Sequence, residues 1–174
     1  MTSGLHSPAY LQSAKVLSYP QHAEELGRKL ADQLNGLIGG EKVELVVSPA
    51  LGGLIIGHEV ARAFGVRFFF TERDAETNRM TLRRGFEVTP GETAVVVEDV
   101  ITTGGSTREV VEVLQGGGAR VLAAGSIIDR SNGKADVGVP RVALERLEVV
   151  AYDPAACPLC RSGEPLLKPG SRKS

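Results

Sequence analysis

Cysteine is scarce in this sequence, since only Cys157 and Cys160 occur among 174 residues. Two cysteines cannot form the set of several disulfides that holds small secreted domains together. Their spacing is that of one half of a zinc site, but no second Cys or His pair accompanies them, so a metal would need ligands from another chain. We therefore expect two reduced thiols near the surface.

Long apolar runs and an excess of one charge are also missing. No stretch of about 18 apolar residues occurs, and the N-terminus lacks the charged-then-apolar pattern of a signal peptide. The formal net charge is −1, and basic residues form no block apart from the short Ser-Arg-Lys-Ser end. These absences argue against membrane and nucleic-acid partners, and they favour small-molecule ligands. We expect a soluble, cytoplasmic protein.

The length and the hydrophobic content of 42% predict a single domain over residues 1–174. Within it, 1–19 suits an extended segment, 20–152 the core, and the Pro- and Gly-containing 153–174 an irregular tail. Apolar residues recur every three or four positions over 20–38, which predicts a helix. Strands alternating with helices predict a doubly wound, mainly parallel, five-stranded α/β sheet flanked by helices. The predicted strands are 44–48, 66–70, the run from Val95, 120–128 and 147–152, and the other helices are 54–64 and the segment from Ser106.

A charged segment over 71–85 shows no apolar periodicity before Leu82. It is the best candidate for a mobile loop or a β-hairpin that closes over a site. Its arginines suit a diphosphate, although any charged surface loop would look similar. These arginines are Arg73, Arg79, Arg83 and Arg84.

The most informative stretch, Val95 to Ser106, reads Val-Val-Val-Glu-Asp-Val-Ile-Thr-Thr-Gly-Gly-Ser. Three β-branched residues predict a buried strand, and the small residues after it can turn successive backbone N–H groups towards one phosphate. Ser106 and Glu109 have the spacing of a capping box, which predicts that a helix begins here and directs its positive end to the same point.

Two carboxylates, Glu98 and Asp99, stand between the predicted strand and this loop. They would repel a phosphate unless they face another group, and two acids can accept hydrogen bonds from the 2- and 3-hydroxyls of a ribose. The alternative is a buried strand that ends in solvated acids, which leaves the glycines and hydroxyls unexplained. A further strand, 120–128, delivers Asp129 and Arg130 at its carboxyl end, the edge where parallel sheets bind ligands.

The stretch Val95 to Ser106 resembles the signature of the type I phosphoribosyltransferases, which bind phosphoribosyl diphosphate (PRPP). Segments 3–11, 70–74 and 126–131 are similar to orotate phosphoribosyltransferases, and the cysteine-bearing tail is similar to that of their shorter bacterial forms. The resemblance implies the type I fold with a small, truncated N-terminal hood. It also implies catalytic roles for Asp99 and Arg73. The implied PRPP site comprises Arg73, Glu98, Asp99, Val100, Ile101, Thr102, Thr103, Gly104, Gly105 and Ser106.

For orotate, the resemblance implies contacts from the backbone of Tyr10 and Leu11, the hydroxyl of Thr102 and the guanidinium of Arg130. A planar ring that carries a carboxylate calls for a bidentate guanidinium, which agrees with Arg130. The family joins N1 of orotate to C1 of the ribose with loss of diphosphate. The resemblance further implies Mg²⁺ held mainly by PRPP without direct protein ligands, and a homodimer. The alternatives are a purine phosphoribosyltransferase and a non-enzymatic PRPP-sensing regulator.

Three positions depart from the family pattern. Glu76 stands near the position of the family's catalytic lysine, and Gly52 replaces a lysine after the first strand. The chain also begins within the family's hood, with Thr2 where a base-site lysine often lies. We expect either an earlier true start, which we favour, or a reduced lid over the base.

Overall fold

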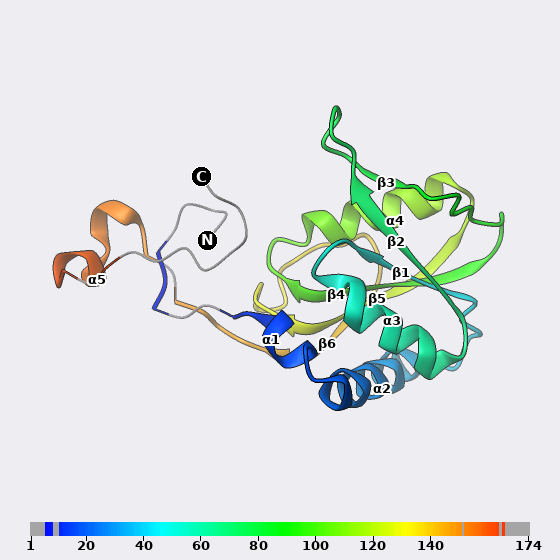
Figure 1. The fold of residues 1–174 in the computed structure, drawn as a ribbon, viewed down its shortest axis with the longest axis horizontal. Coiled ribbons are helices and arrows are strands. Elements are labelled where there is room, and N and C mark those ends of the chain that lie inside the picture. The colour runs from blue at the N-terminus through cyan, green and yellow to red at the C-terminus, as the bar shows by residue number, and fades with distance from the viewer. Residues whose placement is uncertain (1–5, 9–10, 151, 164, 166–174) are drawn as a thin grey trace. The chain divides into compact units, whose positions relative to one another are not determined.

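The structure is a computed structural model that describes residues 6–8, 11–150, 152–163 and 165. Two compact units are present in the chain. The larger unit is Ser13–Leu147, and the smaller unit combines Met1–Gln12 with Glu148–Ser174. Figure 1 labels the elements of both units. Among the described residues, no helix is long and apolar enough to span a membrane.

A six-stranded sheet with the order β3-β2-β1-β4-β5-β6 forms the centre of the larger unit. All neighbouring pairs are parallel except β2 and β3, which form an antiparallel hairpin. The predicted doubly wound, mainly parallel sheet is therefore confirmed, with six strands in place of five. The strands are β1 (Leu45–Pro49), β2 (Arg67–Arg73), β3 (Met80–Leu82), β4 (Thr93–Ile101), β5 (Arg120–Asp129) and β6 (Arg141–Arg146).

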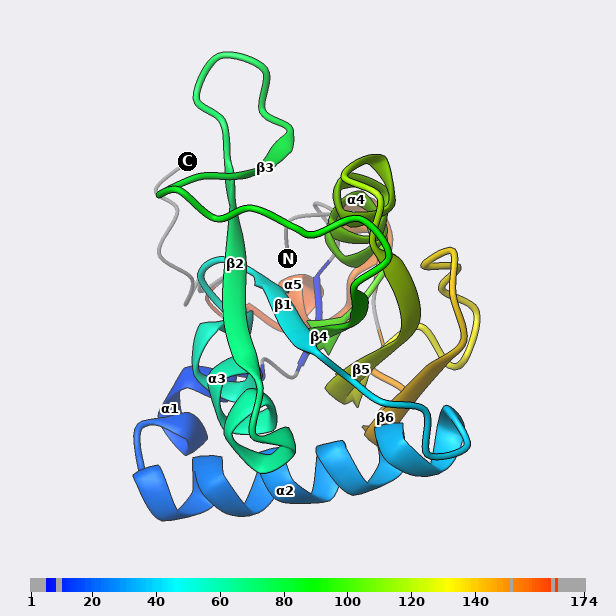
Figure 2. The same ribbon diagram turned by 90° about the vertical axis from the view of Figure 1, so that its right-hand side faces the viewer.

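Helices cover both faces of this sheet, as Figure 2 shows, with α2 and α3 on one face and α4 on the other. Side chains alternate between the faces along a strand, so Val95 and Val97 of β4 pack with α2 and α3, whereas Val96 packs with α4. The result is one hydrophobic cluster on each face. The helices of this unit are α1 (Ser13–Leu17), α2 (Pro20–Leu37), α3 (Gly53–Phe64) and α4 (Gly105–Gly116).

Three sequence-based element assignments are wrong. The last strand is Arg141–Arg146 and not 147–152, because Val142 and Leu144 pack on the cluster of α2 and α3 while Tyr152 pairs with His6 in the smaller unit. Residues 13–17 form α1 and are not extended, since a helical turn buries Leu17 in the same cluster. Strand β2 is longer than predicted and continues through Arg73, because Thr71–Arg73 pair antiparallel with β3, and this pairing confirms the β-hairpin alternative for the charged segment 71–85.

The described part of the smaller unit contains an antiparallel bridge and two short helices. His6 and Tyr152 form the bridge. The helices are the 3₁₀ turn η1 (Pro154–Ala156) and α5 (Pro158–Arg161). The side chain of Asp153 caps η1 by accepting a hydrogen bond from Ala155 N at 2.9 Å. The described tail is thus not irregular as predicted, because Asp153 and the prolines at the first turns favour short helices.

Candidate active site

Glu98 and Asp99 lie near the carboxyl end of β4, at the sheet edge where α3 and α4 begin. The strand continues for two residues beyond them, so Val100 pairs with Ile128 and Ile101 with Asp129 of β5. The acids therefore belong to the strand itself. The sequence pattern had instead placed them after the strand. Their backbone positions are set by the sheet, which makes the carboxylate pair a well-defined feature of this edge.

Glu98 is only 9% exposed. Its Oε1 accepts a hydrogen bond from the backbone N–H of Asp99 at 3.1 Å. Burial raises the pKa of Glu98 well above its usual range, and the neighbouring Asp99 carboxylate raises it further. A buried acid in this state gains stability when hydroxyl donors or a cation approach it.

Asp99 is partly exposed, and its Oδ1 accepts a hydrogen bond from Val100 N at 2.8 Å. Gly52, the residue before α3, lies directly against this carboxylate, and a Cβ atom placed on it would be 2.7 Å from Oδ1. A lysine at position 52 would thus require Asp99 to move. The nearby Ala50–Leu51 peptide bond is cis.

The segment Thr102–Gly104 bends from β4 into α4, and both threonines are exposed. Gly104 has φ 84°, a left-handed conformation that favours glycine, and a Cβ on it would lie 3.0 Å from Val137 Cγ1. Helix α4 then begins at Gly105 without a side-chain cap. Its first N–H groups are therefore available to an anion at the positive end of the helix.

The predicted capping box at Ser106 and Glu109 does not form, because Gly104 is the N-cap and Ser106 lies inside α4. Both side chains are instead bound by Arg73. Its Nη1 donates to Glu109 Oε2 at 3.0 Å, and its Nη2 donates to Ser106 Oγ at 3.2 Å. Glu109 Oε2 also accepts a hydrogen bond from Met80 N at 3.2 Å. The structure thus brings Arg73, from the end of β2, to the start of α4.

The other three hairpin arginines are arranged differently. Arg84 forms two hydrogen bonds with Glu72, at 2.8 and 2.9 Å, and its guanidinium lies over the ring of Phe70. The Arg84 guanidinium lowers the pKa of Glu72. Arg79 and Arg83 are exposed, and neither residue takes part in an ion pair with another described residue. Arg73 is therefore the hairpin arginine that contacts the loop.

Arg130 follows β5 directly, and its backbone N–H donates to Ile101 O at 2.8 Å. Because Thr102 follows Ile101, Arg130 and Thr102 start from adjacent points of the sheet edge. Of the two residues predicted to contact the base through their backbone, Tyr10 lies outside the described residues. Leu11 is partly buried and belongs to the smaller unit.

A buried network beside the loop was not predicted from the sequence. Asp129 is fully buried and accepts hydrogen bonds from Ser131 Oγ at 2.6 Å and Arg141 Nη1 at 2.8 Å. Burial alone would raise its pKa, but the Ser131 hydroxyl and the Arg141 guanidinium bring the pKa of Asp129 down to about 2. Arg141 Nε also donates to Ala135 O at 2.9 Å. This network holds the segment that packs on Gly104, and the only sequence signal for it was Asp129 at the end of a strand.

Comparison with known proteins agrees with this geometry. A family described as "Phosphoribosyl transferase domain" matches residues 16–149. The chain is 49% identical to the orotate phosphoribosyltransferase of Caldanaerobacter subterraneus subsp. tengcongensis, over 99% of this chain and 88% of the relative. It is 52% identical to that of Pelotomaculum thermopropionicum, over the same shares.

A solved structure, orotate phosphoribosyltransferase from Aeropyrum pernix, matches the fold with a TM-score of 0.68 and 24% identity, over 85% of this chain and 84% of that one. The parallel sheet with an acid pair before a glycine loop is thus the type I phosphoribosyltransferase architecture. The identities near one half over almost the whole chain are the more specific finding. This chain belongs to the orotate phosphoribosyltransferase family.

Proposed function

We propose that this chain transfers the phosphoribosyl group of PRPP to N1 of orotate, which gives orotidine 5′-phosphate and diphosphate in de novo UMP biosynthesis. The observation that carries the proposal is the acid pair Glu98–Asp99 beside the uncapped start of α4, with Arg130 at the end of the adjacent strand. Membership of the orotate phosphoribosyltransferase family supports it.

In this proposal PRPP binds along the carboxyl end of β4. Its 5-phosphate accepts hydrogen bonds from backbone N–H groups of the loop Thr102–Ser106, where the positive end of α4 also acts. Glu98 and Asp99 accept hydrogen bonds from the ribose hydroxyls. Glu98 is buried, and a ribose hydroxyl that donates to it offsets part of the free-energy cost of that burial. PRPP binding is therefore favoured by the buried position of this acid.

Orotate binds next to this loop. Arg130 meets its carboxylate with two parallel N–H donors, and the hydroxyl of Thr102 holds the ring. A purine carries no carboxylate and would make little use of Arg130. The acceptor assignment therefore depends mainly on this arginine.

The reaction breaks the bond from C1 of the ribose to diphosphate and forms the bond to N1 of orotate, while the electron pair of the broken bond leaves with diphosphate. Positive charge develops on the ribose, which Glu98 and Asp99 fix in place. Arg73 lies at the start of α4, where it is able to exchange Glu109 and Ser106 for the departing diphosphate. Glu98 and Asp99 bind the ribose hydroxyls in this proposal, so Mg²⁺ would be held mainly by oxygen atoms of PRPP. When bound, Mg²⁺ supplies charge neutralisation of the diphosphate.

We also propose that the chain forms a homodimer. Several large apolar side chains of the larger unit are exposed, among them Leu51 at 80% and Tyr19 at 56%. Apolar side chains in contact with water favour association. Light scattering on the purified chain should give a mass twice that of the 18.4 kDa chain, and a mass equal to one chain would contradict the dimer.

The test is an activity assay with PRPP and Mg²⁺, in which orotate, uracil, hypoxanthine and adenine are supplied separately. Only orotate should release diphosphate at a substantial rate. Arg130→Ala should damage the use of orotate far more than the binding of PRPP, measured by calorimetry. Equal loss of both ligands would make Arg130 structural, and turnover with adenine or hypoxanthine would favour the purine alternative.

A further inference from the structure

The part of the smaller unit that the structure describes has very little hydrophobic core. Among its described residues, Cys157 is the only buried one, and both hydrophobic clusters draw their members from the larger unit alone. A unit of this size falls near or below about 40 residues, where folding usually needs disulfides, a metal or association. Among the described residues, hydrophobic packing therefore contributes little to holding the two ends of the chain together.

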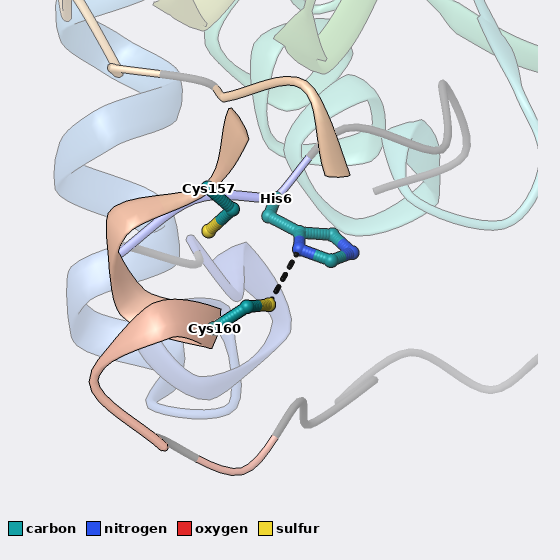
Figure 3. Close-up of side chains that lie close together, drawn as sticks. All are labelled: His6, Cys157 and Cys160. Atoms are coloured by element: carbon teal, nitrogen blue, oxygen red, sulfur yellow. Dashed lines mark hydrogen bonds between the residues drawn. The ribbon is translucent and has the colours of Figure 1, made fainter. Parts of the chain in front are cut away.

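Three metal-binding side chains gather in this unit. Figure 3 shows the side chains of His6, Cys157 and Cys160 close together, although His6 and Cys160 are 154 residues apart in the sequence. The Sγ atom of Cys160 lies 3.2 Å from His6 Nδ1, and the candidate ligand atoms of all three residues lie within 4.8 Å of one another.

The spacing of these atoms fits a tetrahedral metal. Zinc bonds of about 2.3 Å to sulfur and 2.0–2.1 Å to nitrogen place neighbouring ligand atoms about 3.6–3.8 Å apart. The Cys160 Sγ–His6 Nδ1 distance of 3.2 Å and the upper limit of 4.8 Å for all three pairs are compatible with these values after small side-chain movements. Two thiolates and one imidazole are soft or borderline ligands, which favour Zn²⁺ over Mg²⁺ and Ca²⁺.

The backbone around the three side chains is also well ordered by hydrogen bonds. His6 and Tyr152 exchange two backbone hydrogen bonds, at 3.0 and 2.8 Å, which align the N-terminal segment with the start of the tail. Cys157 is the residue before α5, and its carbonyl accepts a hydrogen bond from Arg161 N at 3.3 Å. Cys157 at the N-cap and Cys160 within α5 are thus three residues apart, and Figure 3 shows both side chains near His6.

We propose that His6 Nδ1, Cys157 Sγ and Cys160 Sγ bind a structural Zn²⁺ ion that joins the two ends of the chain. The fourth ligand is a water molecule or a group outside the described residues. This site differs in ligand chemistry from the Mg²⁺ that accompanies PRPP, because thiolates and an imidazole take the place of phosphate oxygen atoms. It also corrects the sequence-based expectation that a metal would need another chain, because His6 of the same chain supplies the third ligand.

The direct test is metal content. The full-length chain, purified under reducing conditions and incubated with Zn²⁺, should retain one zinc ion per chain after dialysis, measured by mass spectrometry of the metal. Competition with a chromophoric chelator should show a loss of affinity of about 10-fold or more in His6→Ala, Cys157→Ser and Cys160→Ser. His22→Ala and His58→Ala are matched controls, because both residues are exposed on helices of the larger unit and should leave the affinity unchanged.

Cobalt provides a second readout, which begins with the wild-type chain and reports the ligand set directly. Co²⁺ bound to the wild-type chain should give the absorption of a tetrahedral ion and a thiolate charge-transfer band of the intensity expected for two Co–S bonds. Either Cys→Ser variant should lose about half of that band. The proposal is overturned if the reduced chain binds no zinc, if His6→Ala binds it as tightly as the wild type, or if the intact mass before reduction shows that Cys157 and Cys160 form a disulfide.

Discussion

Asp129 on β5 and Glu98 on β4 are both buried acids near the carboxyl ends of neighbouring parallel strands, yet their surroundings are opposite. Asp129 accepts hydrogen bonds from Arg141 and from backbone and side-chain donors of the loop that follows it, and its pKa falls to about 2. Glu98 accepts one backbone hydrogen bond and faces Asp99, and its pKa rises well above the usual range.

The difference separates an acid that serves the fold from one suited to a ligand. The cost of burying Asp129 is offset within the chain, and the result is a fixed loop whose residues 135–137 pack on Gly104. At Glu98 the chain leaves the cost largely uncompensated. Hydroxyl groups and a cation brought by a substrate would complete the site.

The largest effect is expected from removing the partner of Asp129. Arg141→Met should lower the free energy of unfolding by about 3–5 kcal/mol, because it leaves a buried carboxylate without its cation. Urea unfolding at neutral pH measures this loss. Arg146→Met, on the exposed end of the same strand, is the matched control and should change stability by less than about 0.5 kcal/mol.

The same variant tests the link to the phosphate loop. Because Arg141 also holds the carbonyl of Ala135, its loss should loosen the segment against Gly104 and raise the KM for PRPP. Comparable losses of stability in Arg141→Met and Arg146→Met would show that the buried pair has no special role.

Glu98→Gln should produce effects of opposite sign on activity and stability. A folded-state pKa above the unfolded value means that the ionised acid destabilises the fold, and this penalty grows as the pH rises above the unfolded pKa of about 4.5. The neutral amide removes the penalty at pH 7, so the free energy of unfolding should stay equal or rise. The kcat/KM for PRPP should fall about 10- to 100-fold, because a charge-assisted hydrogen bond contributes roughly 1.5–3 kcal/mol.

Asp129→Asn is the control for Glu98→Gln. At pH 7 the Asp129 variant should lower the free energy of unfolding, whereas the Glu98 variant should not. Parallel thermal unfolding of both variants gives the comparison. A loss of stability in Glu98→Gln that matched the loss in Asp129→Asn would place both acids among the structural residues.

At acid pH, the free energy of unfolding should change with the protonation of Asp129. Its folded pKa is about 2 against an ordinary value of 3.8, so its stabilising contribution is complete above about pH 4 and is lost as the pH falls towards 2. The difference corresponds to roughly 2 kcal/mol. Urea unfolding at pH values from 5 to 2 should show this decline in the wild type and a flatter profile in Asp129→Asn. Identical slopes would exclude Asp129 as the responsible group.

The sequence predicts those parts of the molecule whose signal is local. Helix α2 has a strong apolar period, and the stretch from Val95 to Ser106 contains strand, acids and loop in one run of residues. Strand β6 was misplaced because it lies at the sheet edge and is only partly buried, so its alternation is weak compared with the apolar run after Leu147.

The missed features depend on contacts between distant residues. Ser106 and Glu109 have the spacing of a capping box, but α4 begins before Ser106, with Gly104 as its N-cap, and Arg73, 36 residues before Glu109, binds both side chains. The pairing of Asp129 with Arg141 likewise requires β6 to be in place beside β5. Spacing along the chain indicates which hydrogen-bond partners are near in sequence. It does not indicate that another strand brings an arginine to the same side chain.

The smallest predicted effect concerns Glu109. Like Asp129 it forms an ion pair with an arginine, but the Glu109 pair is partly exposed and the Asp129 pair is buried. The Arg73–Glu109 pair is partly exposed on both sides, so it should contribute only about 0.2–1 kcal/mol. In the proposed reaction Arg73 must leave Glu109 to meet diphosphate, and Glu109→Gln weakens the bond that is given up. The KM for PRPP should therefore fall about 1.5- to 5-fold with little change in stability, measured by steady-state kinetics. The control Glu112→Gln, on the exposed side of α4, should leave the KM unchanged, and a rise of the KM in Glu109→Gln would mean that Glu109 instead holds Arg73 in its active position.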